Sequence, residues 1–272
     1  MSGIKAAMTS DASNGSPGGT TRRTVIAAGL AAAATGTISG GPDAEAREKR
    51  RAGSKTGARM PVVYIPHGGG PWPFVDLGFD KEEMGQLALY LESLQALPLT
   101  RPTAILAVSA HWEEAVPTVM TAQHPPMLYD YYGFPPASYQ ITWPAPGHPA
   151  VAARVQQLLE GAGFPTGRDP QRGFDHGTFV PLKLTYPAAD VPTVQLSLKK
   201  GLDPKEHLAI GRALAPLRDE GVFIVGSGMS FHNLRALRDP RASGPAREFD
   251  VWLRESAVLE FSEWDGRFAA WS

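Results

Sequence analysis

Hydrophobic residues occur in short runs, separated by amphipathic stretches, from Met60 to the end of the chain. Six β-branched or aliphatic runs are strand candidates, and four of them have the length of strands buried on both faces. The four are Val62–Pro66, Ala104–Ala110, Thr193–Leu198 and Val222–Gly226, and the two weaker ones are Pro117–Ala122 and Tyr139–Trp143. Helical spacing and end signals predict helices over Lys81–Ala96, His148–Gly161, Asp203–Gly221 and Gly244–Phe268. Buried strands alternating with helices predict a single α/β domain, a three-layer α/β/α sandwich around a mixed, mostly parallel sheet.

The first 59 residues differ from the rest of the chain in charge and in hydrophobicity. They hold 9 basic and 4 acidic residues, and the paired Arg22 and Arg23 precede an apolar run rich in Ala and Gly. This run is shorter than the ~20 apolar residues that cross a bilayer, and Ala44-Glu45-Ala46 matches an A-x-A cleavage pattern. The arrangement resembles a twin-arginine signal peptide over residues 1–46, followed by a flexible basic linker over residues 47–59.

This leader predicts the partner and the destination of the protein. We expect the twin-arginine export machinery to deliver it to the periplasm or the extracellular space, without stable membrane association after cleavage. The alternative is a disordered tail that contains two arginines by chance, and the protein would then stay in the cytoplasm. Residues 60–272 form the expected folded domain.

Composition and charge exclude several classes of protein. The chain has 26 Lys+Arg against 27 Asp+Glu and a formal net charge of -1, which offers no electrostatic footprint for nucleic acid. It contains no Cys, so it has no disulfide framework, Cys-ligated zinc site, iron–sulfur cluster or thiol nucleophile. Any metal ion must therefore be held by His, Asp or Glu.

Histidines follow three of the predicted strands. His67 comes after Val62–Pro66, His111 after Ala104–Ala110, and His232 shortly after Val222–Gly226. Ligand sites of open α/β sheets collect at the carboxyl ends of the strands, so these imidazoles could converge on one metal ion. A single histidine near a strand end is more often a structural residue, but the repeated placement favours a metal site.

A fourth histidine, His176, has a different context. It lies in the segment Arg172-Gly173-Phe174-Asp175-His176-Gly177-Thr178, whose glycines indicate a loop that can approach a ligand closely. Asp175 could orient the imidazole or act as a carboxylate ligand.

An esterase is the main competing interpretation of the glycine-rich segment. His67-Gly68-Gly69-Gly70 resembles the oxyanion loop that accompanies a G-x-S-x-G nucleophile motif. No G-x-S-x-G is present, and its nearest match is Gly228-Met229-Ser230-Phe231-His232. The only histidine after Ser230 is His232, with no acidic residue between them, so the order of residues excludes an esterase triad.

Four motifs in order give the chain a family resemblance from about Met60 to the C-terminus. They are Pro66-His67-Gly68-Gly69-Gly70-Pro71, Ser109-Ala110-His111-Trp112-Glu113, Asp175-His176-Gly177 with Val180-Pro181-Leu182, and Gly226-Ser227-Gly228 through His232-Asn233-Leu234. Together they resemble the class III extradiol ring-cleavage dioxygenases, in particular the DOPA-4,5-dioxygenase-like branch. The segments Tyr129-Asp130-Tyr131-Tyr132-Gly133-Phe134-Pro135 and Tyr139-Gln140-Ile141 are also similar to that branch.

The resemblance implies an oxidoreductase that cleaves a catechol-type aromatic substrate with O₂. It implies one divalent metal ion per chain, Zn²⁺ or Fe²⁺, with His67, His111 and His232 as ligands. His176 would be the catalytic acid/base, although its counterpart in some relatives lies close enough to the metal to count as a fourth ligand. Candidates for stacking on the aromatic ring, which could equally be loop-packing residues, are Tyr129, Tyr131 and Trp143.

One departure from the family pattern concerns the C-terminus. Relatives usually continue beyond the position of Ser272 through a segment with its own His- and Glu-containing motif, so we expect a truncated catalytic domain. The alternative to an enzyme is a non-catalytic metal-binding or interaction protein of related fold.

Overall fold

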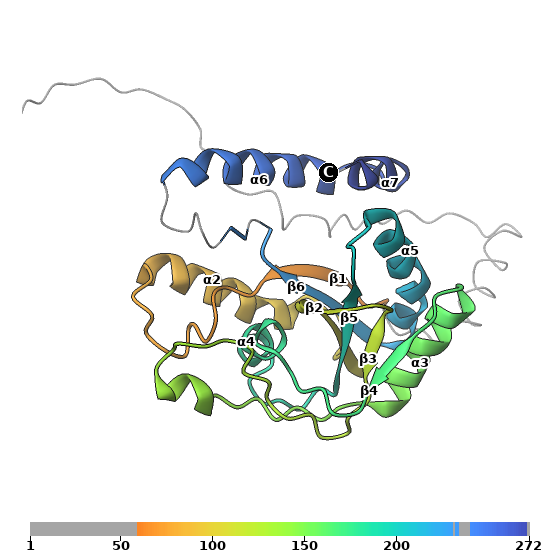
Figure 1. The fold of residues 1–272 in the computed structure, drawn as a ribbon, viewed down its shortest axis with the longest axis horizontal. Helices are drawn as coiled ribbons and strands as arrows, with labels where there is room; N and C mark the ends of the chain where they lie inside the picture. The colour runs from red at the N-terminus through yellow and green to blue at the C-terminus, as the bar shows by residue number, and fades with distance from the viewer. Residues whose placement is uncertain (1–58, 231, 234–239, 271–272) are drawn as a thin grey trace, which may run out of the picture. The chain divides into compact units, whose positions relative to one another are not determined.

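A six-stranded sheet forms the centre of the fold, and its strands lie in the order β1-β6-β2-β5-β3-β4 (Figure 1). The computed structural model describes residues 59–230, 232–233 and 240–270. The strands are β1 (Val62–Pro66), β2 (Ala104–Glu114), β3 (Thr118–Met120), β4 (Gly167–Asp169), β5 (Thr193–Lys199) and β6 (Val222–Gly228). β3 runs antiparallel to β5, and the other neighbouring pairs of this sheet are parallel. The predicted mixed, mostly parallel sheet is therefore confirmed.

Helices cover both faces of this sheet (Figure 1). One face is packed by α2 (Lys81–Ser93) and α4 (His176–Thr185), and the other by α3 (Pro149–Gly161) and α5 (Pro204–Leu214). After β6 follow α6 (Ser243–Ala257) and α7 (Phe261–Ala269), and short 3₁₀ segments are η1 (Leu94–Ala96), η2 (Pro136–Gln140), η3 (Ala215–Glu220) and η5 (Pro240–Ala242). The layers of helix, sheet and helix confirm the predicted α/β/α sandwich.

Successive side chains of a strand point to opposite faces, and this alternation divides the core into two clusters. In β2, Ala104 and Leu106 belong to the apolar cluster under α3 and α5, whereas Ile105 and Ala107 belong to the cluster under α2 and α4. β6 alternates in the same way. Towards the carboxyl ends of the strands, the α2/α4 face changes from apolar to polar, and the polar side chains there are His67, Ser109, His111, Gln195 and Ser227.

The predicted strand Tyr139–Trp143 is wrong. Its first residues belong to the 3₁₀ segment η2, and the rest is irregular. Carbonyls of this proline-rich segment accept hydrogen bonds from the hydroxyls of Tyr129 and Tyr131, at 2.8 and 2.6 Å, rather than from a neighbouring strand. Tyrosine hydroxyls thus satisfy backbone carbonyls that a neighbouring strand would otherwise bind.

The predicted and observed helices also differ. Gly244–Phe268 forms two helices, α6 and α7, and the indole N–H of Trp264 donates to the Leu259 carbonyl in the break between them, at 2.9 Å. α4 was not predicted, because nearly all of its residues are buried and it has no polar face. It also contains Pro181, which is unusual inside a helix.

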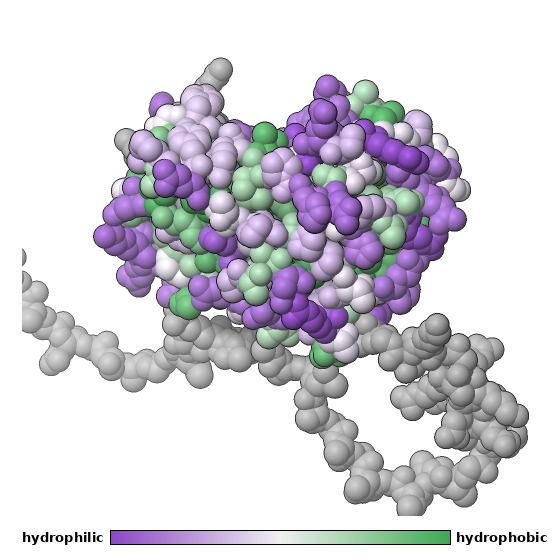
Figure 2. Space-filling model, turned by 90° about the horizontal axis from the view of Figure 1, so that it is seen from below, coloured by the Kyte–Doolittle hydropathy of each residue, from purple (hydrophilic) through white to green (hydrophobic). Residues whose placement is uncertain are grey.

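On the face seen from below, hydrophilic and hydrophobic residues are interspersed (Figure 2). None of the helices in the described part of the chain combines the length and the apolar character needed to cross a bilayer. The predicted signal peptide, and all of the predicted linker except Arg59, lie outside the described residues.

Candidate metal centre

Three imidazoles lie together at the carboxyl edge of the sheet, on its α2/α4 face. His67 directly follows β1, His111 lies in the last part of β2, and His176 is the first residue of α4. The ring centroids of His67 and His111 are 4.8 Å apart, those of His111 and His176 4.0 Å, and those of His67 and His176 5.3 Å. One ring nitrogen of each residue lies within 4.8 Å of the corresponding nitrogens of the other two.

His67 is held by the end of β6. Its side chain is buried, and its Nδ1 lies 3.0 Å from Oγ of Ser227. That hydroxyl donates its only proton to the carbonyl of Gly177 in a short hydrogen bond. Ser227 must therefore accept from His67, whose Nδ1 carries the proton. The other ring nitrogen of His67, Nε2, lies 2.9 Å from Nε2 of His111.

One carboxylate, that of Asp130, reaches the other two rings. Its Oδ1 accepts from Nδ1 of His176 at 2.7 Å and from the backbone N–H of the same residue at 2.9 Å. Its Oδ2 lies 3.6 Å from Nδ1 of His111. A carboxylate behind a metal-binding imidazole fixes the orientation of the ring and raises its basicity.

A second carboxylate, that of Asp175, connects the elements that carry His111 and His176. It is fully buried and caps α4 by accepting from the backbone N–H of Thr178 at 3.1 Å. It also accepts from Oγ of Ser109 at 2.7 Å, and Ser109 in turn accepts from the backbone N–H of His111 at 3.2 Å. Its remaining side-chain donors are Arg172 and Gln195.

Two glycines allow the close packing around these rings. A Cβ on Gly177 would lie 2.9 Å from Cδ2 of His111, closer than side-chain atoms normally approach. Gly68 has a φ of +78°, and a Cβ there would overlap the indole of Trp72. The N–H of that indole donates to the carbonyl of His67 at 2.7 Å. The glycine-rich segment after β1 therefore positions the first histidine, which is the structural use of its small residues.

The surroundings favour neutral imidazoles. Burial, and after it the charges of His111 and His176, lower the pKa of His67 to about 3. Burial and then His176 also lower the pKa of His111, although Asp130 opposes them. Burial on its own would raise the pKa of Asp130, but its hydrogen bonds with His176 and the charge of that ring lower it overall. A metal ion requires this combination, because a ring nitrogen must be unprotonated to bind it.

The chemistry of the group fits a divalent transition metal. Imidazole nitrogens suit both zinc and iron, and bind Zn²⁺ at ~2.0–2.1 Å, which places two nitrogens on one ion ~3 Å apart. The Nε2 atoms of His67 and His111 are 2.9 Å apart. Metal-binding histidines commonly donate their second N–H to an oxygen acceptor, and Ser227 and Asp130 are placed to accept it.

The fourth predicted site histidine, His232, lies apart from this group. It is exposed in the loop after β6 and is not among the three clustered residues. Its charge lowers the pKa of both His67 and His111, so it lies within electrostatic range of them. The structure thus brings together two of the three predicted ligands and the predicted acid/base, His176, which begins a helix instead of lying in a loop. The ligand role of His232 stays a prediction.

The predicted aromatic residues differ in their distance from the imidazoles. The ring of Tyr131 meets that of His176 edge to face, with centroids 5.6 Å apart, and Tyr129 packs against Tyr131 at 6.0 Å. Trp143 is completely buried, and its indole N–H donates to the carbonyl of Tyr186 at 2.9 Å. This placement favours a packing role for Trp143, and its contact with substrate stays a prediction.

Two residues of the site were missed by the analysis of the sequence. Asp130 precedes His176 by 46 residues in an irregular loop, and only its position between two tyrosines of a family-like segment could have drawn attention to it. Ser227 could have been found from strand periodicity, because it lies two residues after the apolar Val225, on the same face.

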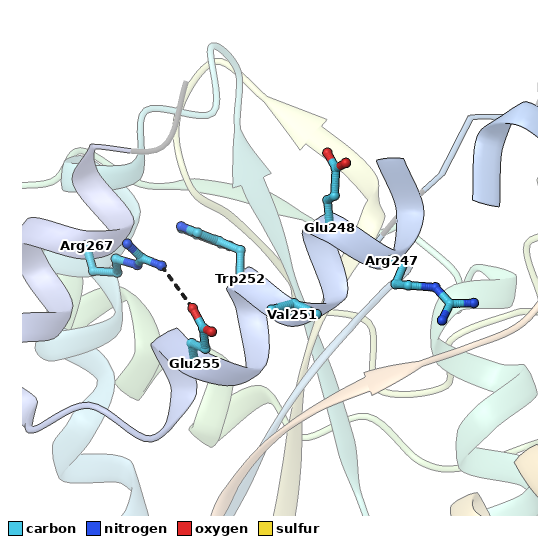
Figure 3. Close-up of a pocket in the computed structure, with 6 residues that line it drawn as sticks. All are labelled: Arg247, Glu248, Val251, Trp252, Glu255 and Arg267. Atoms are coloured by element: carbon cyan, nitrogen blue, oxygen red, sulfur yellow. Dashed lines mark ion pairs between the residues drawn. The ribbon is translucent and has the colours of Figure 1, made fainter. Parts of the chain in front are cut away.

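A hollow of the surface lies on α6 and α7 (Figure 3). An ion pair between Arg267 of α7 and Glu255 of α6 crosses it, with a nitrogen–oxygen distance of 3.8 Å. Its lining residues, which include none of the site histidines, are Arg247, Glu248, Val251, Trp252, Glu255 and Arg267. The hollow is therefore distinct from the metal centre.

Comparisons with known proteins identify related dioxygenases. The model of a family described as "Catalytic LigB subunit of aromatic ring-opening dioxygenase" matches residues 61–264. "Dioxygenase tasH" of Hapsidospora irregularis is 44% identical over 191 residues, which cover 69% of this chain and 59% of the relative. "4,5-DOPA dioxygenase extradiol" of Portulaca grandiflora is 45% identical over 170 residues, which cover 59% of this chain and 60% of the relative. The chain thus spans about three fifths of the length of these curated relatives.

A solved structure supports the fold. The crystal structure of an uncharacterized protein from Escherichia coli K12 matches with a TM-score of 0.57 and 33% sequence identity. The match covers 74% of each chain.

Proposed function

The chain belongs to the LigB family of aromatic ring-opening dioxygenases, as its motifs predicted, and on this basis we propose that it cleaves a catechol-type substrate. The cleavage is extradiol, and both atoms of O₂ enter the ring-opened product. The names of the relatives support this activity. The observation that carries the proposal is the group of three imidazoles, each with one ring nitrogen within 4.8 Å of the others.

In the proposal, some residues of the site bind a metal ion and another transfers a proton. In the proposal, His67, His111 and His232 hold one Zn²⁺ or Fe²⁺ ion. When bound, this ion supplies a Lewis-acidic centre at which the catechol oxygens and dioxygen can meet. His67 is buried and fixed by Ser227, so its ring is in place before a ligand arrives.

His176 is the proposed acid/base. Its Nδ1 is hydrogen-bonded to the carboxylate of Asp130 at 2.7 Å, which leaves Nε2 free to take a phenolic proton and later return it. The negative charge of Asp130 stabilises the imidazolium while the proton is held. Tyr131 lies edge to face against this ring and provides an aromatic wall beside it.

The division between ligands and acid/base can be tested by metal analysis. His67→Ala, His111→Ala and His232→Ala should purify largely free of metal, because the loss of even an indirect partner typically costs 10–100-fold in affinity. His176→Ala should keep most of its metal and lose ~10²–10⁴-fold in ring cleavage, measured by single-turnover kinetics. If His176→Ala loses its metal as completely as the others, His176 is a ligand, as its place in the cluster of three would allow.

The activity itself is tested by oxygen uptake. Protein reconstituted anaerobically with Fe²⁺ should consume O₂ in an oxygen electrode with at least one member of a panel of catechols. Full occupancy by zinc or iron without oxygen uptake across the panel would support a non-catalytic metal-binding protein instead.

The proposed route to the site of action is export. We propose that residues 1–46 direct the protein through the twin-arginine machinery, because Arg22 and Arg23 precede a mild apolar run and an A-x-A site. The double variant Arg22→Lys/Arg23→Lys should remain in the cytoplasm in a cell-fractionation experiment. Unchanged delivery outside the cytoplasm would contradict the proposal.

A further inference from the structure

Helix α6 has a partly buried side and an exposed side. Ser256 is buried, and Phe249 and Leu253 are half-buried, and their helical spacing places these three residues on one side. Next to this side, the ring of Trp252 packs edge to face against that of Phe268 in α7, with centroids 5.6 Å apart. These contacts hold α6 against α7 and leave its opposite side towards solvent.

The exposed side carries a stripe of residues spaced three and four apart, as one face of a helix requires. The exposed stripe of α6 consists of Gly244, Arg247, Val251, Glu255 and Val258. Its two valines are 40% and 83% exposed. Arg247, Val251 and Glu255 also line the hollow of Figure 3. Apolar side chains between charged ones are typical of a helix face that packs against another helix.

The charges along this stripe are symmetric about Val251, with their signs reversed. Arg247 lies four residues before Val251, and Glu255 lies four residues after it. At the edges of the stripe, Glu248 and Arg254 lie three residues before and after the same valine. In two antiparallel copies of α6 that meet at Val251, each of these charges faces its opposite. A parallel pair would instead bring like charges together.

The ends of the stripe also match each other in shape. Val258 lies seven residues after Val251, and Gly244 lies seven residues before it. In the antiparallel arrangement, the valine of one copy therefore faces the glycine of the other. A Cβ on Gly244 would meet nothing within 4 Å, so the space that this valine needs is open.

We propose that the exposed stripe of α6 is the interface of a homodimer, in which two copies of α6 pack antiparallel about Val251. Charged residues that flank an apolar seam determine the partner and the orientation of paired helices. Their present partners within the chain hold them only weakly. Glu255 lies 3.8 Å from Arg267, and Arg254 lies 3.3 Å from Asp250. These four side chains are 40–73% exposed, so water screens both pairs.

The dimer should be weak, because one pair of short helices makes a small interface. α6 has 15 residues and is therefore about 22 Å long. Two such helices bury less than the ~1,200–2,000 Å² of a standard stable interface. We therefore expect a dissociation constant in the micromolar range rather than a permanent dimer.

Sedimentation velocity of the full-length chain tests the association. Between ~1 and ~200 μM, a range that brackets a micromolar dissociation constant, the chain should change from monomer to dimer. A monomer at every concentration would overturn the proposal. The experiment needs neither metal nor substrate, so its result is separate from that of the proposed activity.

Reversal of charge tests the orientation of the two helices. Arg247→Glu brings two carboxylates together at each end of the seam and should weaken the dimer at least ~10-fold. Adding Glu255→Arg to the same chain restores opposite charges and should restore the original dissociation constant. The matched control is Lys205→Glu, an equal change of charge at an exposed position of α5, which should leave the dimer unchanged. A double variant no tighter than Arg247→Glu alone would contradict the antiparallel arrangement.

Val251→Glu tests the centre of the interface. It places two carboxylates at the symmetry axis and should weaken the dimer ~100-fold or more, because like charges in contact repel strongly. Val251→Leu keeps the centre apolar and should keep the dimer. The side chain is exposed in the monomer, so circular dichroism should show the same helix content in both variants. An unchanged dissociation constant in Val251→Glu would mean that association uses another surface, and would overturn the proposal.

Discussion

The two faces of the sheet are built from the same strands but in different ways. Under α3 and α5, alternate residues in the first parts of β2 and β6, beginning with Ala104 and Val222, belong to an apolar cluster. Under α2 and α4, the cluster begins with apolar residues and ends in buried polar ones, among them Ser109, Asp175 and Ser227. The first face stabilises the fold mainly by the burial of apolar side chains. The second must satisfy every polar group it buries, and this requirement positions the three imidazoles.

The largest expected effect on stability comes from the buried carboxylate of the polar face. Asp175→Ala should lower the free energy of unfolding by about 3–5 kcal/mol, because it leaves the guanidinium of Arg172 and two neutral side-chain donors without their acceptor. The measurement is urea unfolding followed by circular dichroism. A loss below about 1 kcal/mol would show that water satisfies these donors and that the polar face is less closed than its contacts indicate.

A truncation on the apolar face should destabilise the fold without touching the site. Leu159 of α3 is fully buried, and Leu159→Ala should cost about 3 kcal/mol through lost burial and the cavity left behind. Zn²⁺ affinity should stay as in the unchanged chain. A weaker affinity for Zn²⁺ in the folded variant would contradict the separation of the two faces.

A methyl group added to the polar face should affect Zn²⁺ affinity as well as stability. Gly177→Ala places a methyl group 2.9 Å from His111 and 2.7 Å from Oγ of Ser109, so these groups must shift. We expect a loss of about 1–3 kcal/mol in stability from overpacking, and a Zn²⁺ affinity that falls at least ~10-fold as the ring moves. Gly211→Ala in α5, where the new methyl group meets open space, is the matched control and should stabilise the helix by up to about 1 kcal/mol. Equal Zn²⁺ affinity in the two variants would mean that the ring tolerates the shift.

The pattern of apolar and polar residues also explains which strands and helices could be predicted from the sequence. Val62–Pro66 was predicted with the bounds that the structure shows, because a short β-branched run has few alternatives. The same run does not show which of its residues face which layer, since apolar residues stand at all of its positions. α4 escaped prediction for a related reason: a helix buried on all sides has no polar stripe to reveal its period.

The site was predictable only where its residues follow the strands. His67 and His111 lie at strand ends, and the order of parallel strands brings them together. Asp130 lies in an irregular loop whose course depends on hydrogen bonds such as that from Tyr131 to the Ser138 carbonyl, and no periodic pattern encodes them. The antiparallel placement of β3 beside β5 was not predictable either, because a strand of three residues with a single bridge to β5 carries little directional signal.

The smallest expected effect lies outside both faces, where α7 meets α5. Nη1 of Arg212 lies 2.6 and 2.8 Å from the two carboxylate oxygens of Asp265, and the two side chains remain 46% and 53% exposed. Solvent and salt screen such a pair, so Asp265→Asn should change the free energy of unfolding by no more than about 1 kcal/mol, and by less at high salt. Urea unfolding at two salt concentrations measures this, with Zn²⁺ affinity as the second readout. A loss above about 2 kcal/mol, or any loss of metal, would mean that α7 contributes to the sheet faces as well as to the surface. The separation into a stabilising face and a metal-binding face would then have to include α7 as well.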